Sequence, residues 1–218
     1  MQLEVPLFRQ PERSAECGPA SIQMLLAYYG VETSREEILA DIPMKEGGTV
    51  GPELGLYLLR HGFEVEIVTM HPRLFNIASN FETREALISH LESLESKMKG
   101  EWNPWALSSF IQFIKEGGAI TPKVPDLGDI RDEITEKRPL ISLLTHWFLF
   151  DSGLPPRFTG HFNVVTGIDE SFVYVNDPDW GDPFGGKHAH GTREYMYAVH
   201  ASAYQSADNA SLIKVKRK

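Results

Sequence analysis

The sequence predicts an α+β fold in which N-terminal helices pack on a C-terminal antiparallel sheet. Apolar residues recur at helical spacing early in the chain, beginning with residues 18–29. Near the C-terminus, residues 161–168 and 172–176 are two strand-like apolar runs joined by a short polar turn, which indicates an antiparallel hairpin. The chain has 218 residues, 42% hydrophobic and 23% charged. This length and composition are typical of a soluble globular protein, and we expect residues 1–218 to form a single domain.

The first third of the chain is expected to hold three helices and one strand. Ile22 lies in the apolar stripe of the first helix, and Gly30 ends that helix. Ser34 and Glu37 have capping-box spacing and open the second helix. Thr49 is expected to cap the third helix. The predicted ranges are an extended segment at 5–10, a first helix at 18–29, a third helix ending at 62, and a strand at 63–69.

The middle of the chain has the least clear pattern. Residues 83–98 and 107–115 predict two helices, which would form a helical insertion or lid at about 71–117. Further along, the predicted elements are a polar helix at 129–137, strands at 140–144, 161–168, 172–176 and 211–216, and a rigid loop at 177–186 that is rich in Asp, Pro and Gly.

Charge and cysteine content exclude several functional classes. The net charge of −9 argues against a general nucleic-acid or anionic-membrane binder. A single cysteine rules out an intramolecular disulfide framework. The N-terminus lacks the pattern of a secretory signal. The best apolar run, residues 140–150, is too short for a membrane span and contains His146. We therefore expect a cytoplasmic, bacterial-type protein that needs no cofactor.

Cys17 is the only cysteine, and it lies where an irregular stretch becomes a helix. Pro19 suits the first turn of a helix, where its missing N–H costs nothing. A thiol at this position faces unpaired main-chain N–H groups and the positive end of the helix dipole, and both favour the nucleophilic thiolate. A buried structural cysteine is the alternative.

A nucleophilic cysteine needs a base for its proton and a third group that orients the base. His161 begins one predicted strand and Asp177 follows the strand paired with it. The antiparallel hairpin therefore places both at one sheet edge, where the helix that follows Cys17 could present its thiol. The Cys17 main-chain N–H and a side-chain amide such as that of Gln10 could form an oxyanion hole.

Three blocks of sequence carry a resemblance to a known family. They are Gln10 with Cys17-Gly18-Pro19-Ala20-Ser21 and Tyr28-Tyr29-Gly30, then Gly160 to Ile168, then Val173 to Pro178. The chain resembles the C39 family of papain-like cysteine peptidases and its C39-like relatives, which have Gln, Cys, His and Asp in this order. The chain departs from the family in placing its glutamine seven positions before the cysteine, one more than expected. Residues 70–125 match no recognisable part of the family.

The resemblance implies a papain-like fold and a set of roles. Gln10 would be the oxyanion donor, Cys17 the nucleophile, His161 the general base and acid, and Asp177 the residue that orients His161. The best-known members cleave leader peptides after a Gly-Gly pair as domains of ABC exporters. This chain has neither membrane spans nor a phosphate-binding loop, so we expect a free-standing member without the export role. The expected partner is a peptide or protein, possibly Gly-rich.

Other residues could bind a metal or line the cleft, but most of them have simpler structural roles. The carboxylates of the loop beginning at Asp177 could suggest calcium, but the full ligand pattern is missing. His188 and His190 lack further ligands at metal-site spacing, which favours a solvated loop. We therefore expect no metal site. Trp180 is expected to line the substrate cleft, and His146 to serve mainly in packing.

Three functions are compatible with these residues. The first is a cysteine peptidase that hydrolyses a peptide or isopeptide-like bond. The second is an acyl transferase or transpeptidase on the same scaffold, in which an amine replaces water. The third is a degenerate, non-catalytic module that binds peptides. The presence of all four candidate residues argues against the third, and the sequence does not separate the first two. It does not indicate an oligomeric state.

Overall fold

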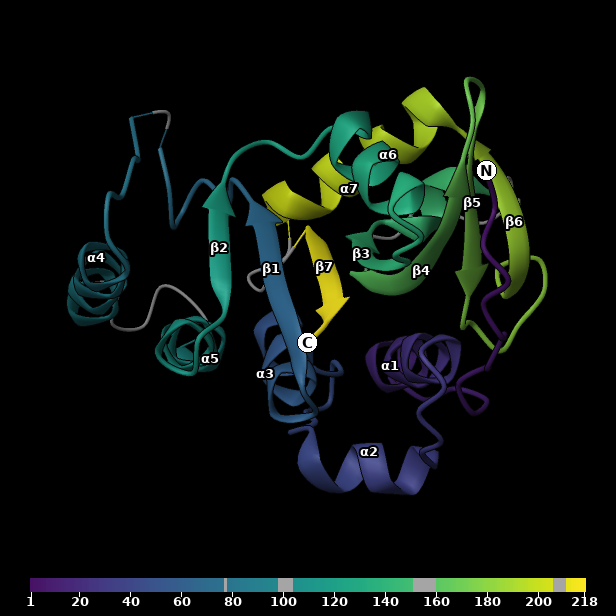
Figure 1. The fold of residues 1–218 in the computed structure, drawn as a ribbon, viewed down its shortest axis with the longest axis horizontal. Coiled ribbons are helices and arrows are strands. Elements are labelled where there is room, and N and C mark those ends of the chain that lie inside the picture. Colours follow the sequence, from purple (N-terminus) through teal and green to yellow (C-terminus); the bar gives the residue numbers. More distant parts are fainter. Residues whose placement is uncertain (77, 98–103, 151–159, 206–210) are drawn as a thin grey trace.

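A computed structural model of the chain describes residues 1–76, 78–97, 104–150, 160–205 and 211–218. Its centre is a seven-stranded sheet with the order β2-β1-β7-β3-β4-β5-β6 (Figure 1). The strands are β1 (Phe63–Thr69), β2 (Ala119–Pro122), β3 (Leu140–Leu144), β4 (His161–Ile168), β5 (Phe172–Asp177), β6 (Gly186–Gly191) and β7 (Leu212–Arg217). All neighbours are antiparallel except β1 and β2, which are parallel. The predicted hairpin is β4–β5, with a register shift between Val165 and Gly167.

Helices cover both faces of the sheet, as Figure 1 shows. The helices are α1 (Cys17–Tyr28), α2 (Arg35–Asp41), α3 (Gly51–Arg60), α4 (Arg84–Lys97), α5 (Pro104–Lys115), α6 (Leu127–Thr135), the 3-10 helix η1 (His146–Leu149) and α7 (Thr192–Gln205). On one face, α1 packs on β4 and α3 packs on β1, while α6 and α7 contact β4 and β3 from the other. The predicted α+β class is confirmed, with helices on both faces instead of one.

The sheet and the helices on its two faces enclose two apolar cores, one on each side of the sheet. Along β3, Ile141 and Leu143 join the core under α1, α3 and α5, whereas Leu140 and Leu144 join the core under α6 and α7. Successive side chains of a strand point to opposite faces, so a strand buried on both sides must be apolar throughout. This explains why β3 is an uninterrupted apolar run in the sequence.

Several local predictions are wrong for identifiable reasons. Thr49 does not cap the third helix, because α3 begins after Val50 with proline in its first turn and no side-chain cap. The polar helix begins earlier than predicted because Asp126 and Asp129 form a capping box there. His188 and His190 lie in strand β6 instead of a solvated loop, and His190 is buried. Strand β2 and helix α7 were not predicted.

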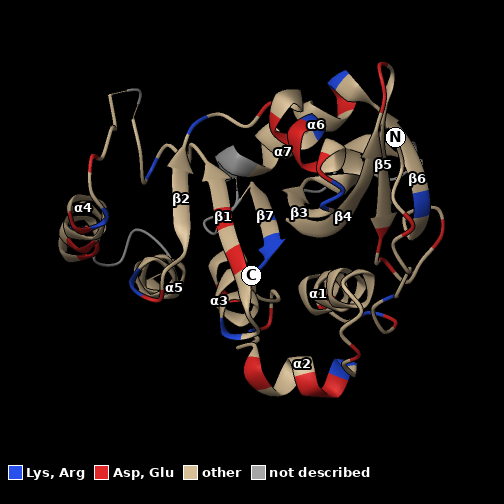
Figure 2. Ribbon diagram, in the orientation of Figure 1, with Lys and Arg blue, Asp and Glu red and all other residues tan. Residues whose placement is uncertain are grey.

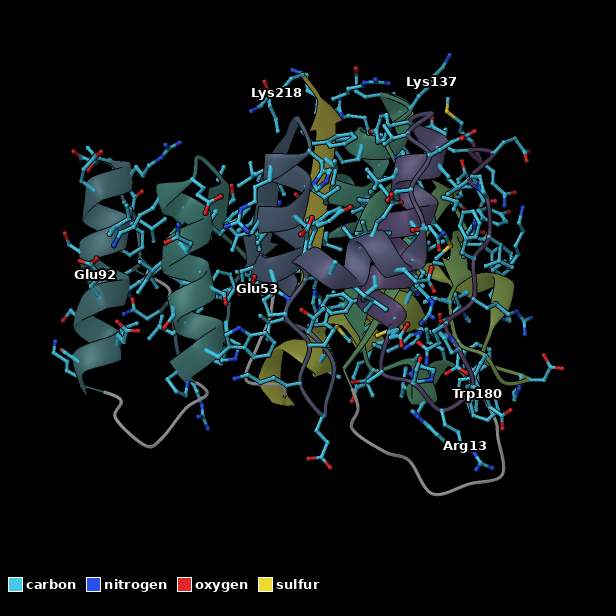
Figure 3. All side chains as sticks on the ribbon, turned by 90° about the horizontal axis from the view of Figure 1, so that it is seen from below. Arg13, Glu53, Glu92, Lys137, Trp180 and Lys218 are labelled. Carbon is cyan, nitrogen blue, oxygen red and sulfur yellow. The ribbon has the colours of Figure 1, made fainter. Side chains whose placement is uncertain are left out.

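The region from about 71 to 117 is an extension at the β2 end of the sheet. Helix α4 packs on α5, and α5 packs on α3. The α3–α5 contact is close: a Cβ added at Gly55 would lie 2.7 Å from Phe113 Cε2. Figure 3 shows Glu92 of α4 at the opposite end of the molecule from Arg13 and Trp180. Residue 98, the last of the first predicted helix, lies outside the described residues.

Charge is spread over many elements. Figure 2 shows Asp and Glu on α2, α4, α6 and β1, with Lys and Arg between them. None of the described helices has the length and apolar character needed to cross a bilayer.

Candidate active site

Cys17 is the first residue of α1 and is half-buried. The residue before it, Glu16, provides no side-chain cap, and first-turn N–H groups have no partner within a helix. Glycine at position 18 allows α1 to begin against the loop before α3, since an added Cβ would lie only 2.8 Å from Thr49 Cγ2. The thiol is therefore held at an uncapped helix N-terminus, where the dipole favours negative charge.

The N-terminal segment places Gln10 beside the hairpin. The Gln10 main-chain N–H donates to the Pro178 carbonyl at 2.8 Å, and Asn176 Nδ2 donates to the Val5 carbonyl at 2.9 Å. The Gln10 side chain is buried, and its Nε2 donates to the Ser14 carbonyl at 2.8 Å. An amide nitrogen carries two hydrogens, so this bond leaves one N–H of Gln10 for another acceptor.

His161 and Asp177 form a buried pair. His161 is the first residue of β4 and Asp177 the last of β5. His161 Nε2 donates to Asp177 Oδ1 at 2.7 Å, and the same oxygen accepts the Asp179 main-chain N–H at 2.9 Å. Cys17 lines the same cleft as His161 and interacts electrostatically with its ring. Because Asp177 occupies Nε2, Nδ1 is the ring nitrogen left for the thiol.

The electrostatics of this pair favour a charged imidazole. Burial lowers the pKa of His161, but the negative charge of Asp177, its hydrogen bond with the ring and the interaction with Cys17 outweigh burial, so the pKa lies well above its usual value. The three side chains therefore have the arrangement of a nucleophile, a base and an orienting carboxylate.

These residues open into a cleft of about 720 Å³. Its walls include Gln10, Arg13, Cys17, His146, Trp147, His161, Asp179, Trp180 and Phe184. Arg13 and Trp180 lie together on the outer side of the molecule in Figure 3. Trp180 is 41% exposed, so its ring is available to a ligand, as the sequence predicted. Among the described residues, none of α4 or α5 lines the cleft.

A second histidine–carboxylate pair lies beside the first. His146 opens η1 directly after β3 and is buried, and its ring centroid lies 4.2 Å from that of His161. His146 Nε2 lies 3.5 Å from Asp179 Oδ2, while Asp179 Oδ1 accepts the Gly181 N–H at 2.8 Å. Burial lowers the pKa of His146, and the charge on His161 lowers it further. His146 is therefore the neutral ring of the two.

Sequence reasoning gave these two residues no role in the chemistry. His146 was expected to serve in packing, and Asp179 appeared only as one carboxylate of a weak calcium pattern. The signal that could have found them is position: His146 follows a buried strand paired with β4, and Leu144 lies opposite His161 in that pairing. The carboxylates of Asp177 and Asp179 are engaged by His161 and by loop N–H groups, which argues against a calcium loop. His146, His161 and Asp179 offer ligand atoms within 4.8 Å of one another.

The chain matches the profile of a known family, and solved structures share its fold. The profile of a family described as "Peptidase_C39 like family" matches residues 2–211. Among solved structures, a double glycine motif protease from an AMS/PCAT transporter, in complex with the leader peptide, has a TM-score of 0.51 at 18% identity, covering 100% of this chain and 94% of that one. No protein with a curated description is matched.

Two further solved structures are similar at lower scores. A C39-like peptidase from Bacillus anthracis has a TM-score of 0.48 at 14% identity, covering 99% of this chain and 96% of that one. The peptidase domain of Streptococcus ComA, described as a bifunctional ABC transporter involved in quorum sensing, has a TM-score of 0.48 at 13% identity, covering 99% and 100%. At these identities the likeness concerns the fold.

Proposed function

Because the chain belongs to the Peptidase_C39 like family, we propose that it is a cysteine peptidase with Cys17 as nucleophile, His161 as general base and acid, and Asp177 as the residue that orients His161. One observation carries this proposal. The His161 ring shares a cleft with Cys17, with which it interacts electrostatically, and hydrogen bonds to the buried Asp177 at 2.7 Å. A buried structural cysteine would need neither partner.

The first half of the reaction forms an acyl-enzyme. The Cys17 thiolate attacks the carbonyl carbon of the substrate amide, and the carbonyl oxygen becomes an oxyanion. The Cys17 main-chain N–H at the start of α1 and the free N–H of Gln10 Nε2 stabilise this oxygen. The His161 imidazolium then donates its proton to the departing amine as the C–N bond breaks. Asp177 keeps the ring in place through both steps.

The second half of the reaction hydrolyses the acyl-enzyme and releases the carboxylic acid product. Neutral His161 takes a proton from water, the resulting hydroxide attacks the thioester carbonyl, and the Cys17–carbonyl bond breaks to restore the thiolate–imidazolium pair. An amine in place of water would give acyl transfer by the same steps. A peptide is the substrate class that suits the cleft, and the leader-peptide complex of the double glycine motif protease makes a Gly-rich segment the first one to test.

The test uses the fact that Cys17 is the only thiol. Brief treatment of the native protein with iodoacetamide should add one adduct, detected by mass, and His161→Ala should slow this reaction by about 10-fold or more because the imidazolium no longer favours thiolate. Asp41→Asn on exposed α2 is the matched control and should react like the wild type. A native Cys17 that reacts no faster than a buried thiol would overturn the proposal.

A peptide library with and without hydroxylamine then separates the alternatives. Cleavage products that carry a free carboxylate indicate hydrolysis. Hydroxamate products show that a thioester acyl-enzyme forms, and products joined to an added peptide amine in preference to water indicate an acyl transferase. Binding of peptides without either product, by a protein whose Cys17 is unreactive, would indicate the non-catalytic module.

A further inference from the structure

The His146–Asp179 pair has no part in the reaction outlined above, yet it faces the catalytic histidine. The distance of 3.5 Å between His146 Nε2 and Asp179 Oδ2 is longer than an N–H···O hydrogen bond of about 2.7–3.2 Å. His146 Nδ1 is buried and has no hydrogen-bond partner among the described residues. Nδ1 points away from Asp179, so it is the long gap between His146 Nε2 and Asp179 Oδ2 that leaves room for an additional ligand between the two groups.

The spacing of these atoms suits a divalent cation. With metal–ligand bonds of about 2.1 Å, two ligands of a tetrahedral zinc ion are separated by about 3.4 Å, close to the observed 3.5 Å between His146 and Asp179. His161 contributes a third ligand atom, within 4.8 Å of the other two. We propose that the cleft binds one zinc ion through His146, His161 and Asp179, with its fourth position facing Cys17, and that the bound ion blocks the nucleophile.

The chemistry of the ligands selects the ion. Two imidazoles and one carboxylate, beside a thiol, suit Zn²⁺ and similar borderline metals, while Mg²⁺ and Ca²⁺ prefer sites made of oxygen ligands. Asp177 already bonds to the His161 ring, the kind of carboxylate contact that orients a metal-bound histidine. Asp179 Oδ1 is fixed by the Gly181 N–H, which leaves Oδ2 to face the ion.

Zinc binding and catalysis compete for the same ring nitrogen. A nitrogen of His161 that ligates the ion has its lone pair in the metal–ligand bond, so it cannot also exchange a proton with Cys17 or with a leaving amine. The Cys17 sulfur lies outside the three-residue group but lines the same cleft as His146, His161 and Asp179, and the proposal places it next to the fourth position. The resulting species holds no imidazolium to protonate a leaving amine. This blockade, unlike the binding, rests on the proposed roles of Cys17 and His161.

Direct zinc titration tests the site without any substrate. Competition with a chromophoric zinc chelator should give one zinc per chain, unaffected by Mg²⁺ or Ca²⁺. Asp179→Asn keeps an oxygen for the Gly181 N–H but removes the charge facing the ion, and His146→Gln removes an imidazole. Each should weaken zinc binding by at least about 10- to 100-fold, the scale seen when even a supporting residue of a metal site is lost.

Matched controls and a second readout complete the test. Asp182→Asn, an exposed carboxylate of the same loop, and His61→Gln, an exposed histidine at the end of α3, should bind zinc like the wild type. Zinc should also slow iodoacetamide modification of Cys17, and a chelator should restore it. If His146→Gln fails to fold, Asp179→Asn decides alone.

Three outcomes would overturn the zinc site: no stoichiometric zinc, zinc affinity unchanged in Asp179→Asn, or equal loss in the Asp182→Asn control. The two proposals can fail separately. A protein that binds zinc through these residues but cleaves no peptide would overturn the peptidase and not the site. A protein that cleaves peptides but binds no zinc would overturn the zinc site and not the peptidase.

Discussion

Asp177→Asn should lower the pKa of His161. The substitution preserves shape, because the amide oxygen of asparagine can accept from His161 Nε2 and from the Asp179 N–H, as Asp177 Oδ1 does at 2.7 and 2.9 Å. Only the charge is lost. Hydrogen bonds to charged groups contribute about 1.5–3 kcal/mol and neutral ones about 0.5–1.5 kcal/mol. The protonated ring of His161 should therefore lose about 1–1.5 kcal/mol of stabilisation in the variant.

The sign of the effect on stability follows from the same shift. The pKa of His161 is raised in the folded protein, so its contribution to stability is fully present below the unfolded pKa of about 6.5 and is lost as the pH rises through the folded pKa. The wild type should therefore be more stable than Asp177→Asn at mildly acidic pH. That advantage should shrink once His161 has lost its proton in both proteins.

Nuclear magnetic resonance of histidine-labelled protein measures the shift without a substrate. The ring signal of His161 is assigned by its absence from His161→Gln, and its titration is compared between the wild type and Asp177→Asn. Asp41→Asn, an exposed carboxylate on α2, controls for a change in net charge. A His161 titration that stays in place, or moves to higher pH, in Asp177→Asn would refute the argument that the Asp177 charge holds this proton.

Two further predictions concern Gln10 and the α3–α5 contact. Gln10→Ala should reduce kcat by about 100-fold or more with a smaller change in KM, since an oxyanion donor acts mainly in the transition state; steady-state kinetics on any cleaved peptide measures this, and an unchanged kcat would remove Gln10 from the site. Gly55→Ala should destabilise the fold by about 1–3 kcal/mol through overpacking, because the new Cβ would lie 2.7 Å from Phe113. Urea unfolding measures it, and Phe113→Leu should relieve part of the cost if the clash is the cause.

Local patterns were sufficient to predict much of the framework. Strands β1, β3 and β4 have the predicted ranges, because alternating or continuous apolar runs depend on neighbours within the strand. The capping box at Ser34 and Glu37 is present, since it too is a contact between near neighbours. Helix α7 was missed although it is well formed. Its apolar face is short, and its burial against β3 is a tertiary contact that the sequence pattern does not display.

The candidate site also combines residues that sequence motifs predict with residues that only the fold brings beside them. Sequence motifs, read through a family resemblance, selected Gln10, Cys17, His161 and Asp177, because each lies in a short local pattern at the start or end of an element. Only the tertiary structure placed His146 and Asp179 beside them, since β3 and the loop after β5 come together through strand pairing and packing. The tertiary structure also set the charge states. The pKa of His161 is raised by the charge of Asp177 against the effect of burial, and that of His146 is lowered mainly by burial; the fold creates both environments.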